Sequence, residues 1–174
     1  MTSFREIIRL DLTDISIYKG IFCLDFGARV LSKYSESLKK FSQYSLDIQC
    51  PFRFILGEKI ILASYDISKR FQENLDDKMG NSVFDKLLDE RISPLLPLKV
   101  IDCICNPLGD IKIIFSNDVI LETFIDASLE VEHYRLADET KDFTQDLIFS
   151  KDEESFAEKS KNYVWLEAHK PRNL

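Results

Sequence analysis

The sequence is poor in glycine, proline and histidine, with five Gly, five Pro and two His in 174 residues. So little Gly and Pro argues against a disordered or linker-rich chain, and no internal repeat or low-complexity tract is evident. No apolar run reaches about 18 residues, so no transmembrane helix is expected. The first residues, MTSFREIIRLDLTD, carry charges where a secretory signal needs an apolar stretch. These absences predict a cytoplasmic protein, folded as a single domain over residues 1–174.

Sequence motifs of catalysis and metal binding are also missing. The chain contains no H-E-x-x-H, G-x-S-x-G, P-loop or G-x-G-x-x-G motif. Cys103 and Cys105 form a C-x-C pair, but a metal site would need two further ligands at suitable spacing. The four cysteines are therefore expected to be free, buried thiols, and no metal or cofactor is expected. We expect a protein that is not an enzyme.

One alternative rests on His133. This histidine lies in the stretch EVEHY, where Glu130 or Glu132 could orient its ring as a general base. A small hydrolase built on that pair would need a pocket that holds His133. The more ordinary interpretation is a histidine on a strand at a sheet surface.

What the sequence does contain is a β-favouring core. Apolar residues make up 45% of the chain, and there are thirteen Phe. Alternating apolar positions predict strands before residue 66 and again after residue 98. Three two-residue stretches predict hairpin turns: Lys19-Gly20, Gly57-Glu58 and Asn117-Asp118. The short connections after residue 98 favour an antiparallel meander.

The stretch GDIKIIFSNDVILETF (109–124) is expected to be the central hairpin of that meander. With a simple two-residue turn at Asn117-Asp118, Glu122 would lie on the apolar side of the hairpin. A β-bulge or a longer loop would resolve that conflict.

Helices are predicted between the two groups of strands. Residues 68–79 and 82–92 carry apolar side chains at helical spacing, and the second segment is the clearer one. A polar helix is predicted from Ser150, followed by Tyr163 and Trp165, so residues 150–174 form a helical and aromatic tail docked on the body. The predicted class is α+β, largely an antiparallel sheet with two or three helices on one face.

Charge is unevenly distributed along the chain, whose net charge is −7. Residues 1–57 carry 8 basic and 6 acidic side chains, whereas residues 110–158 carry 4 basic and 14 acidic ones. So acidic a segment repels phosphate groups, which argues against direct nucleic-acid binding. It suits a basic protein partner instead. A solvated acidic surface that only keeps the protein soluble is the alternative.

Several stretches together resemble a family of small bacterial proteins: LDIQCPFRF (46–54), SYDI (64–67), GNSVFDKLLDERI (80–92), the hairpin 109–124 and EHYRL (132–136). The resemblance spans roughly residues 20–137. Asp118 replaces the usual turn glycine, and Tyr134 replaces the usual tryptophan. Phe52 and Phe54 are expected in the core, with Arg53 paired to Asp66. Related small acidic proteins act as immunity or antitoxin partners in bacterial toxin systems.

The resemblance and the charge together predict an immunity protein. It would bind a toxin C-terminal domain, such as a nuclease, through an acidic surface, as in contact-dependent growth inhibition. A regulatory or scaffold binding module without a toxin partner is the alternative. The oligomeric state stays open. The predicted contacts are exposed acidic side chains with two aromatic anchors: Glu130, Glu132, Tyr134, Asp138, Glu139, Asp142, Asp152, Glu153, Glu154 and Trp165.

Overall fold

The fold, seen in a computed structural model, is one 10-stranded antiparallel sheet in the order β10-β9-β3-β2-β1-β6-β7-β8-β4-β5. The structure describes residues 3–18, 20–31, 40–68, 83–128, 131–141 and 147–150, with only the backbone for 67–68 and 147–150. The strands are β1 (Asp11–Tyr18), β2 (Ile21–Leu31), β3 (Lys40–Ile48), β4 (Phe52–Leu56), β5 (Lys59–Ala63), β6 (Leu98–Cys105), β7 (Ile111–Phe115), β8 (Val119–Thr123), β9 (Glu132–Asp138) and β10 (Leu147–Ser150).

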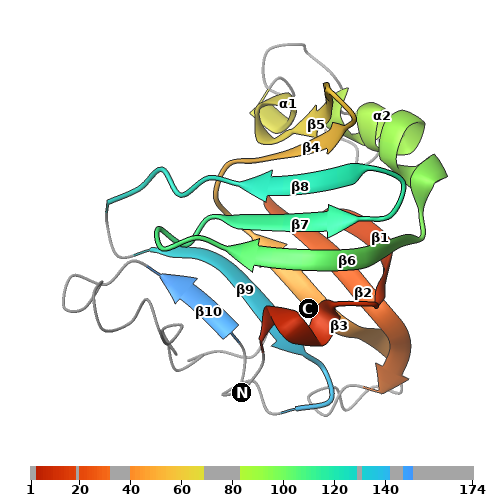
Figure 1. Cartoon of the computed structure of the whole chain (residues 1–174), viewed down its shortest axis with the longest axis vertical. Helices are drawn as coiled ribbons and strands as arrows, with labels where there is room; N and C mark the ends of the chain where they lie inside the picture. Colours follow the sequence, from red (N-terminus) through yellow and green to blue (C-terminus); the bar gives the residue numbers. More distant parts are fainter. Residues whose placement is uncertain are drawn as a thin grey trace.

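The sheet folds back on itself into two layers (Figure 1). Layer A contains β10, β9, β3, β2 and β1, and layer B contains β6, β7, β8, β4 and β5. The strands of layer B cross in front of those of layer A (Figure 1). The two layers are joined by a short pairing of β1 with β6, in which Asp11 lies opposite Lys99.

The core lies between the two layers and is rich in phenylalanine. Phe22 of layer A stacks on Phe52 of layer B with 4.1 Å between ring centroids. Phe54 and Phe84 approach the same ring edge-on, at 6.0 and 5.8 Å. Such stacked and edge-on pairs add to the stabilisation from burial of the rings themselves. The expectation that Phe52 and Phe54 belong to the core is confirmed.

Helical structure is limited among the described residues. A helix begins at Val83 as α2 (Val83–Leu87) and continues as a π-helical turn, η3 (Leu88–Ile92). The only other α-helical segment in the described ranges is α1 (Ser64–Ser68), and two 3-10 turns, η1 (Phe4–Ile7) and η4 (Ser93–Leu95), precede β1 and β6. None of these helices reaches 18 apolar residues, so within the described part of the chain no helix could span a bilayer.

The helix predicted at 82–92 is therefore confirmed, whereas two or three helices packed on one face are not seen. The α1 and α2 segments lie beside β4 and β5 at one end of the molecule (Figure 1). Phe84 of α2 is fully buried, because it reaches the core beside Phe22. The predicted helices at 68–79 and in the tail, and the docking of residues 150–174, lie outside the described residues.

A pseudo-two-fold axis relates the two layers, although the sequence shows no repeat. In the sheet order each layer has a three-stranded meander, β1-β2-β3 or β6-β7-β8, followed by a hairpin. The hairpins are exchanged: β4-β5 extends the second meander and β9-β10 extends the first. The axis passes through the pair Asp11 and Lys99, where β1 meets β6.

The strand registers support this symmetry in detail. Both β1 and β6 contain a bulge, ending at Asp14 in one and at Asp102 in the other. At each bulge the aspartate accepts a hydrogen bond from the next backbone N–H, at 2.9 Å to Ile15 and 2.8 Å to Cys103. Arg135 lies opposite Asp47 in layer A, and its counterpart Arg53 lies opposite Glu122 in layer B. The two layers therefore share one pattern of registers.

The prediction of one continuous meander after residue 98 is wrong, because the hairpins are exchanged between the layers. The strands β6, β7 and β8 follow one another as expected, but β8 pairs with β4, and β9 pairs with β3 in the other layer. The chain therefore leaves layer B at Thr123, the end of β8, and is in layer A at Glu132, the start of β9. Short connections alone could not reveal this, because a short link can join neighbouring strands or cross between layers.

The predicted turns are found where they were expected. Gly20 and Gly57 have φ of +84° and +58°, and each lies in a two-residue turn, between β1 and β2 and between β4 and β5. Asn117 and Asp118 both have positive φ, +61° and +57°. Glu122 pairs with Lys112, one residue away from the simple two-residue register, so its side chain lies on the outer side of the hairpin. The conflict seen in the sequence is thereby resolved.

Candidate protein-binding face

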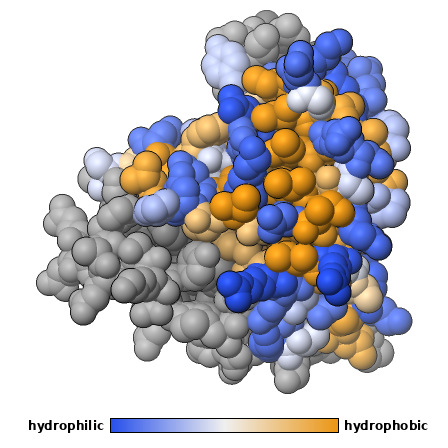
Figure 2. All heavy atoms as spheres, in the orientation of Figure 1, coloured by the Kyte–Doolittle hydropathy of each residue, from blue (hydrophilic) through white to orange (hydrophobic). Residues whose placement is uncertain are grey.

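The outer face of layer B carries a row of isoleucines that crosses all five strands. Ile114 pairs with Ile120, Ile120 with Ile55, and Ile55 with Ile60. Ile101, at the bulge of β6, continues the row. We call these five side chains the isoleucine row. Figure 2 views this face and shows apolar side chains gathered over the strands of layer B, between charged ones. Ile60 and Ile101, at the two ends of the row, are 56% and 55% exposed.

The equivalent positions in layer A have a different character. By register, Asp25, Ser45 and Ala137 stand where layer B has Ile114, Ile120 and Ile55. Ser45 and Ala137 are also buried, with exposed fractions of 6% and 5%. The same backbone pattern thus tolerates polar and small side chains on its outer face. The isoleucine row of layer B is therefore not required by the architecture of the sheet.

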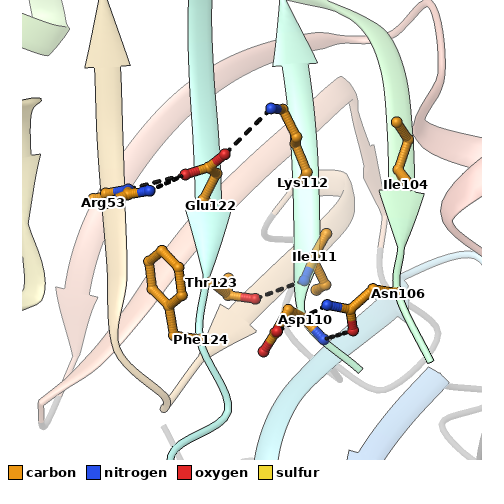
Figure 3. A pocket seen from close by; sticks show the side chains of 9 residues that line it. All are labelled: Arg53, Ile104, Asn106, Asp110, Ile111, Lys112, Glu122, Thr123 and Phe124. Atoms are coloured by element: carbon orange, nitrogen blue, oxygen red, sulfur yellow. Dashed lines mark hydrogen bonds and ion pairs between the residues drawn. The ribbon is translucent and has the colours of Figure 1, made fainter. Parts of the chain in front are cut away.

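Beside the row lies a groove, shown in Figure 3, with a cavity volume of about 310 Å³. Its centre is the Glu122 carboxylate, which receives hydrogen bonds from the Nε and Nη2 atoms of Arg53 at 2.9 and 2.7 Å. Lys112 Nζ lies 3.2 Å from the other carboxylate oxygen. The Arg53 guanidinium also lies over the Phe124 ring, 4.8 Å from its centroid.

These contacts define the charge of the groove. Hydrogen bonds from Arg53, together with Lys112, hold the pKa of Glu122 below its ordinary value although partial burial opposes this. The carboxylate therefore stays ionised at neutral pH. The predicted pairing of Arg53 with Asp66 is wrong, because Asp66 instead accepts the backbone N–H of Ala63 at 2.9 Å.

The lower end of the groove is a loop held by Asn106 and Asp110. Asn106 Oδ1 accepts the backbone N–H groups of Leu108 and Asp110, at 2.9 and 3.0 Å. Asp110 Oδ1 accepts the backbone N–H of Ile125 at 2.7 Å, and its Oδ2 accepts Asn106 Nδ2 at 2.9 Å. The polar groups of this loop are hydrogen-bonded to one another and to Ile125, which follows β8, so the loop forms a preformed wall of the groove.

The sequence-predicted contacts lie elsewhere, on β9 and the turn after it. Glu132 forms an ion pair with Arg135, 2.7 Å between Oε2 and Nη2, and also accepts Gln49 Nε2 at 3.0 Å. Glu139 is half-buried, and its backbone N–H bonds to Gln43. The Glu132 carboxylate is thus already engaged within the protein.

Two of the predicted contacts are buried, so their expected exposure is wrong. Tyr134 is fully buried, because its ring faces the core and lies 5.7 Å from that of Phe4. Asp138 is 2% exposed and bonds to Thr140 and Lys141, with 3.0 Å between Asp138 Oδ2 and Lys141 Nζ. The alternation of β9 turns both side chains toward the core. The remaining predicted contacts lie outside the described residues: Glu130, Asp142, Asp152, Glu153, Glu154 and Trp165.

His133 and the cysteines have placements that bear on the other predictions. His133 is 3% exposed and does not line the groove, and its backbone carbonyl accepts the N–H groups of Gln49 and Cys50. The four cysteines are free thiols, of which only Cys50 is buried and the others are half-buried. Burial raises the pKa of Cys50 to about 11. Among the described residues no group of three His, Cys, Asp or Glu could hold a metal ion.

No protein-family model, curated protein sequence or solved structure matches the chain. The argument about function therefore depends on the geometry of this structure and on the sequence patterns already described.

Sequence reasoning missed the outer face of layer B as a site. A signal was present, because Ile111, Ile113 and Phe115 alternate with Lys112 and Ile114, and both faces of that strand are thus partly apolar. A strand that is apolar on both sides is buried on both sides or binds something. The pairing of β4 with β8, which completes the isoleucine row, could not be read from the sequence.

Proposed function

We propose that this protein is an immunity protein that binds a bacterial toxin domain through the outer face of layer B and thereby neutralises it. The observation that carries the binding role is the isoleucine row, five outward-facing side chains on one sheet face. Contiguous exposed apolar patches on soluble proteins commonly mark interaction sites. The equivalent positions of layer A carry Asp25, Ser45 and Ala137, and since Ser45 and Ala137 are buried these positions form no exposed apolar patch.

The immunity role rests on the sequence resemblance, and the charge distribution supports it. A net charge of −7, concentrated in residues 110–158, would attract a basic toxin domain over long range. Such steering depends on the summed charge and does not need each acid to touch the partner. In this proposal the acidic segment speeds association, and the isoleucine row supplies most of the contact energy.

The test is a growth-rescue assay with structure-based variants. The C-terminal domain encoded by the reading frame directly upstream is expressed with and without this protein. Wild type is expected to relieve toxicity and to co-purify with the domain. Ile60→Glu and Ile101→Glu are expected to abolish rescue, because each places a charge in the apolar contact.

The matched control is Leu31→Glu. Leu31 is 56% exposed, as is Ile60, but it lies in β2 of layer A, so its substitution is expected to leave rescue intact. Equal rescue by Ile60→Glu and wild type would remove the isoleucine row from the mechanism. A non-toxic upstream domain would favour the second candidate, a regulatory binding module that uses the same face.

A further inference from the structure

In the groove beside the isoleucine row, more hydrogen-bond donors than acceptors remain open. Both oxygens of Glu122 are engaged, one by Arg53 and the other by Lys112. Both oxygens of Asp110 are engaged as well, by the N–H of Ile125 and the amide of Asn106. A carboxylate has about four acceptor sites, so about three of the eight sites on Glu122 and Asp110 remain open.

A larger number of donors remains available. Of the five N–H groups of Arg53, two bond to Glu122, and of the three on Lys112, one is directed to the same carboxylate. The Arg53 and Lys112 side chains are 39% and 43% exposed, so these N–H groups are accessible. Two cations share the Glu122 carboxylate at the centre of the groove, and the second carboxylate of the lining, Asp110, lies at its lower end. Figure 3 shows Arg53, Glu122 and Lys112 in one line across β4, β8 and β7.

Apolar side chains lie on both sides of these charged groups. Phe124, 39% exposed, lies under the Arg53 guanidinium, and Ile104, 49% exposed, closes the opposite side. An arginine stacked on an aromatic ring is held in place and loses less freedom on binding. The chemistry that fits the groove is therefore a carboxylate flanked by apolar groups.

We propose that this groove binds an aspartate or glutamate side chain of the protein partner, with the neighbouring apolar residues of that segment packed on Phe124 and Ile104. The inference rests on the proposed function for the existence of a protein partner and deepens it by naming what the partner presents. It assigns the groove a charge preference opposite to that of the acidic segment 110–158. A partner that is basic overall would thus carry a local acid at this position.

The test uses the isolated full chain and does not require the toxin. Backbone amide chemical shifts are followed by NMR during titration with acetyl-Leu-Glu-Leu-amide, with acetyl-Leu-Gln-Leu-amide and with sodium acetate. We expect saturable shifts at Arg53, Lys112 and Phe124 with the glutamate peptide, and at least about tenfold weaker binding of the glutamine peptide. Lys112→Gln should weaken the binding of the glutamate peptide to a similar extent. Lys99→Gln, an exposed lysine of β6 outside the groove, should change its affinity less than about twofold.

Three results would overturn the inference. No shifts at these amides would show that the groove binds no such segment, and equal binding of both peptides would show that the carboxylate is not recognised. Acetate that binds as tightly as the glutamate peptide would show a small-anion site without a role for the apolar walls. The proposed function fails separately, through rescue that does not depend on Ile60 and Ile101.

Discussion

Asp25 and Asp138 are two carboxyl groups with little solvent exposure whose pKa values are shifted in opposite directions by their surroundings. Burial, together with the nearby charge of Asp14, raises the pKa of Asp25. Burial also opposes the charged form of Asp138, but hydrogen bonds from Thr140 and Lys141 outweigh it and hold the pKa of Asp138 below its ordinary value. Lys141 in turn bridges Asp138 to Glu6, which ties the turn after β9 to the N-terminal segment.

The opposite shifts predict opposite effects of the same substitution. A raised folded-state pKa means that ionising Asp25 costs stability as pH rises above its unfolded value of about 4, so Asp25→Asn should raise the melting temperature at pH 7. A lowered pKa means that ionised Asp138 contributes stability above that pH, which is lost as pH falls through the folded value. Asp138→Asn should therefore lower the melting temperature at pH 7.

Thermal unfolding followed by circular dichroism between pH 3 and pH 7 measures both effects. The Asp25 difference should shrink as the pH falls from the raised folded-state pKa toward about 4, whereas the Asp138 difference should shrink only below about 4, as the pH falls toward the lowered folded-state pKa. Shifts of the same sign at pH 7 would contradict this account of the two sites.

At the scale of the element, the turn of the β7-β8 hairpin places two non-glycine residues in a backbone conformation that favours glycine. Asn117 and Asp118 both adopt positive φ, which is the geometry of a turn that favours Asn followed by Gly. An L-residue pays a steric cost in this region, and Asp pays less than most because its side chain bonds locally.

We therefore expect Asp118→Gly to stabilise the protein by about 0.5 kcal/mol and Asp118→Ala to destabilise it by about 1 kcal/mol. The gain with glycine is small because glycine also has more freedom to lose on folding. Urea denaturation at neutral pH measures both values. A more stable alanine variant would mean that the turn relaxes out of its left-handed geometry.

At the scale of the whole molecule, the exchanged hairpins make each half of the chain dependent on the other. The β4-β5 hairpin pairs with β8, and the β9-β10 hairpin pairs with β3. Phe22 of the first half packs on Phe84 of the second, and on Phe52 and Phe54 of the opposite layer. Neither half can close its own sheet without a partner strand.

This arrangement predicts fragment complementation. Residues 1–80 and 81–174, produced separately, should each lack a cooperative unfolding transition, because each leaves a meander edge and a hairpin unpaired. Mixed in equal amounts, they should recover the circular dichroism spectrum of the intact chain and elute together in size exclusion. A cooperative transition in residues 1–80 alone would show that the exchange is not needed for folding.

Much of the secondary structure of this protein depends on residues close together in the chain and can therefore be predicted from the sequence. The strand positions, the turns at Gly20, Gly57 and Asn117-Asp118, and the helix from Val83 follow from alternation, glycine placement and helical spacing, which depend on neighbours in the chain. The burial of Phe52 and Phe54 follows in the same way.

What only the tertiary structure decided is which strands meet. The crossing of the chain between layers, after β3 and after β8, assembles the isoleucine row, pairs Arg53 with Glu122 instead of Asp66, and buries Tyr134 and Asp138. Strand pairing between distant segments depends on backbone hydrogen bonds that every residue can form and on burial summed over the whole core. Neither leaves a local pattern in the chain, so the isoleucine row forms only when the sheet closes.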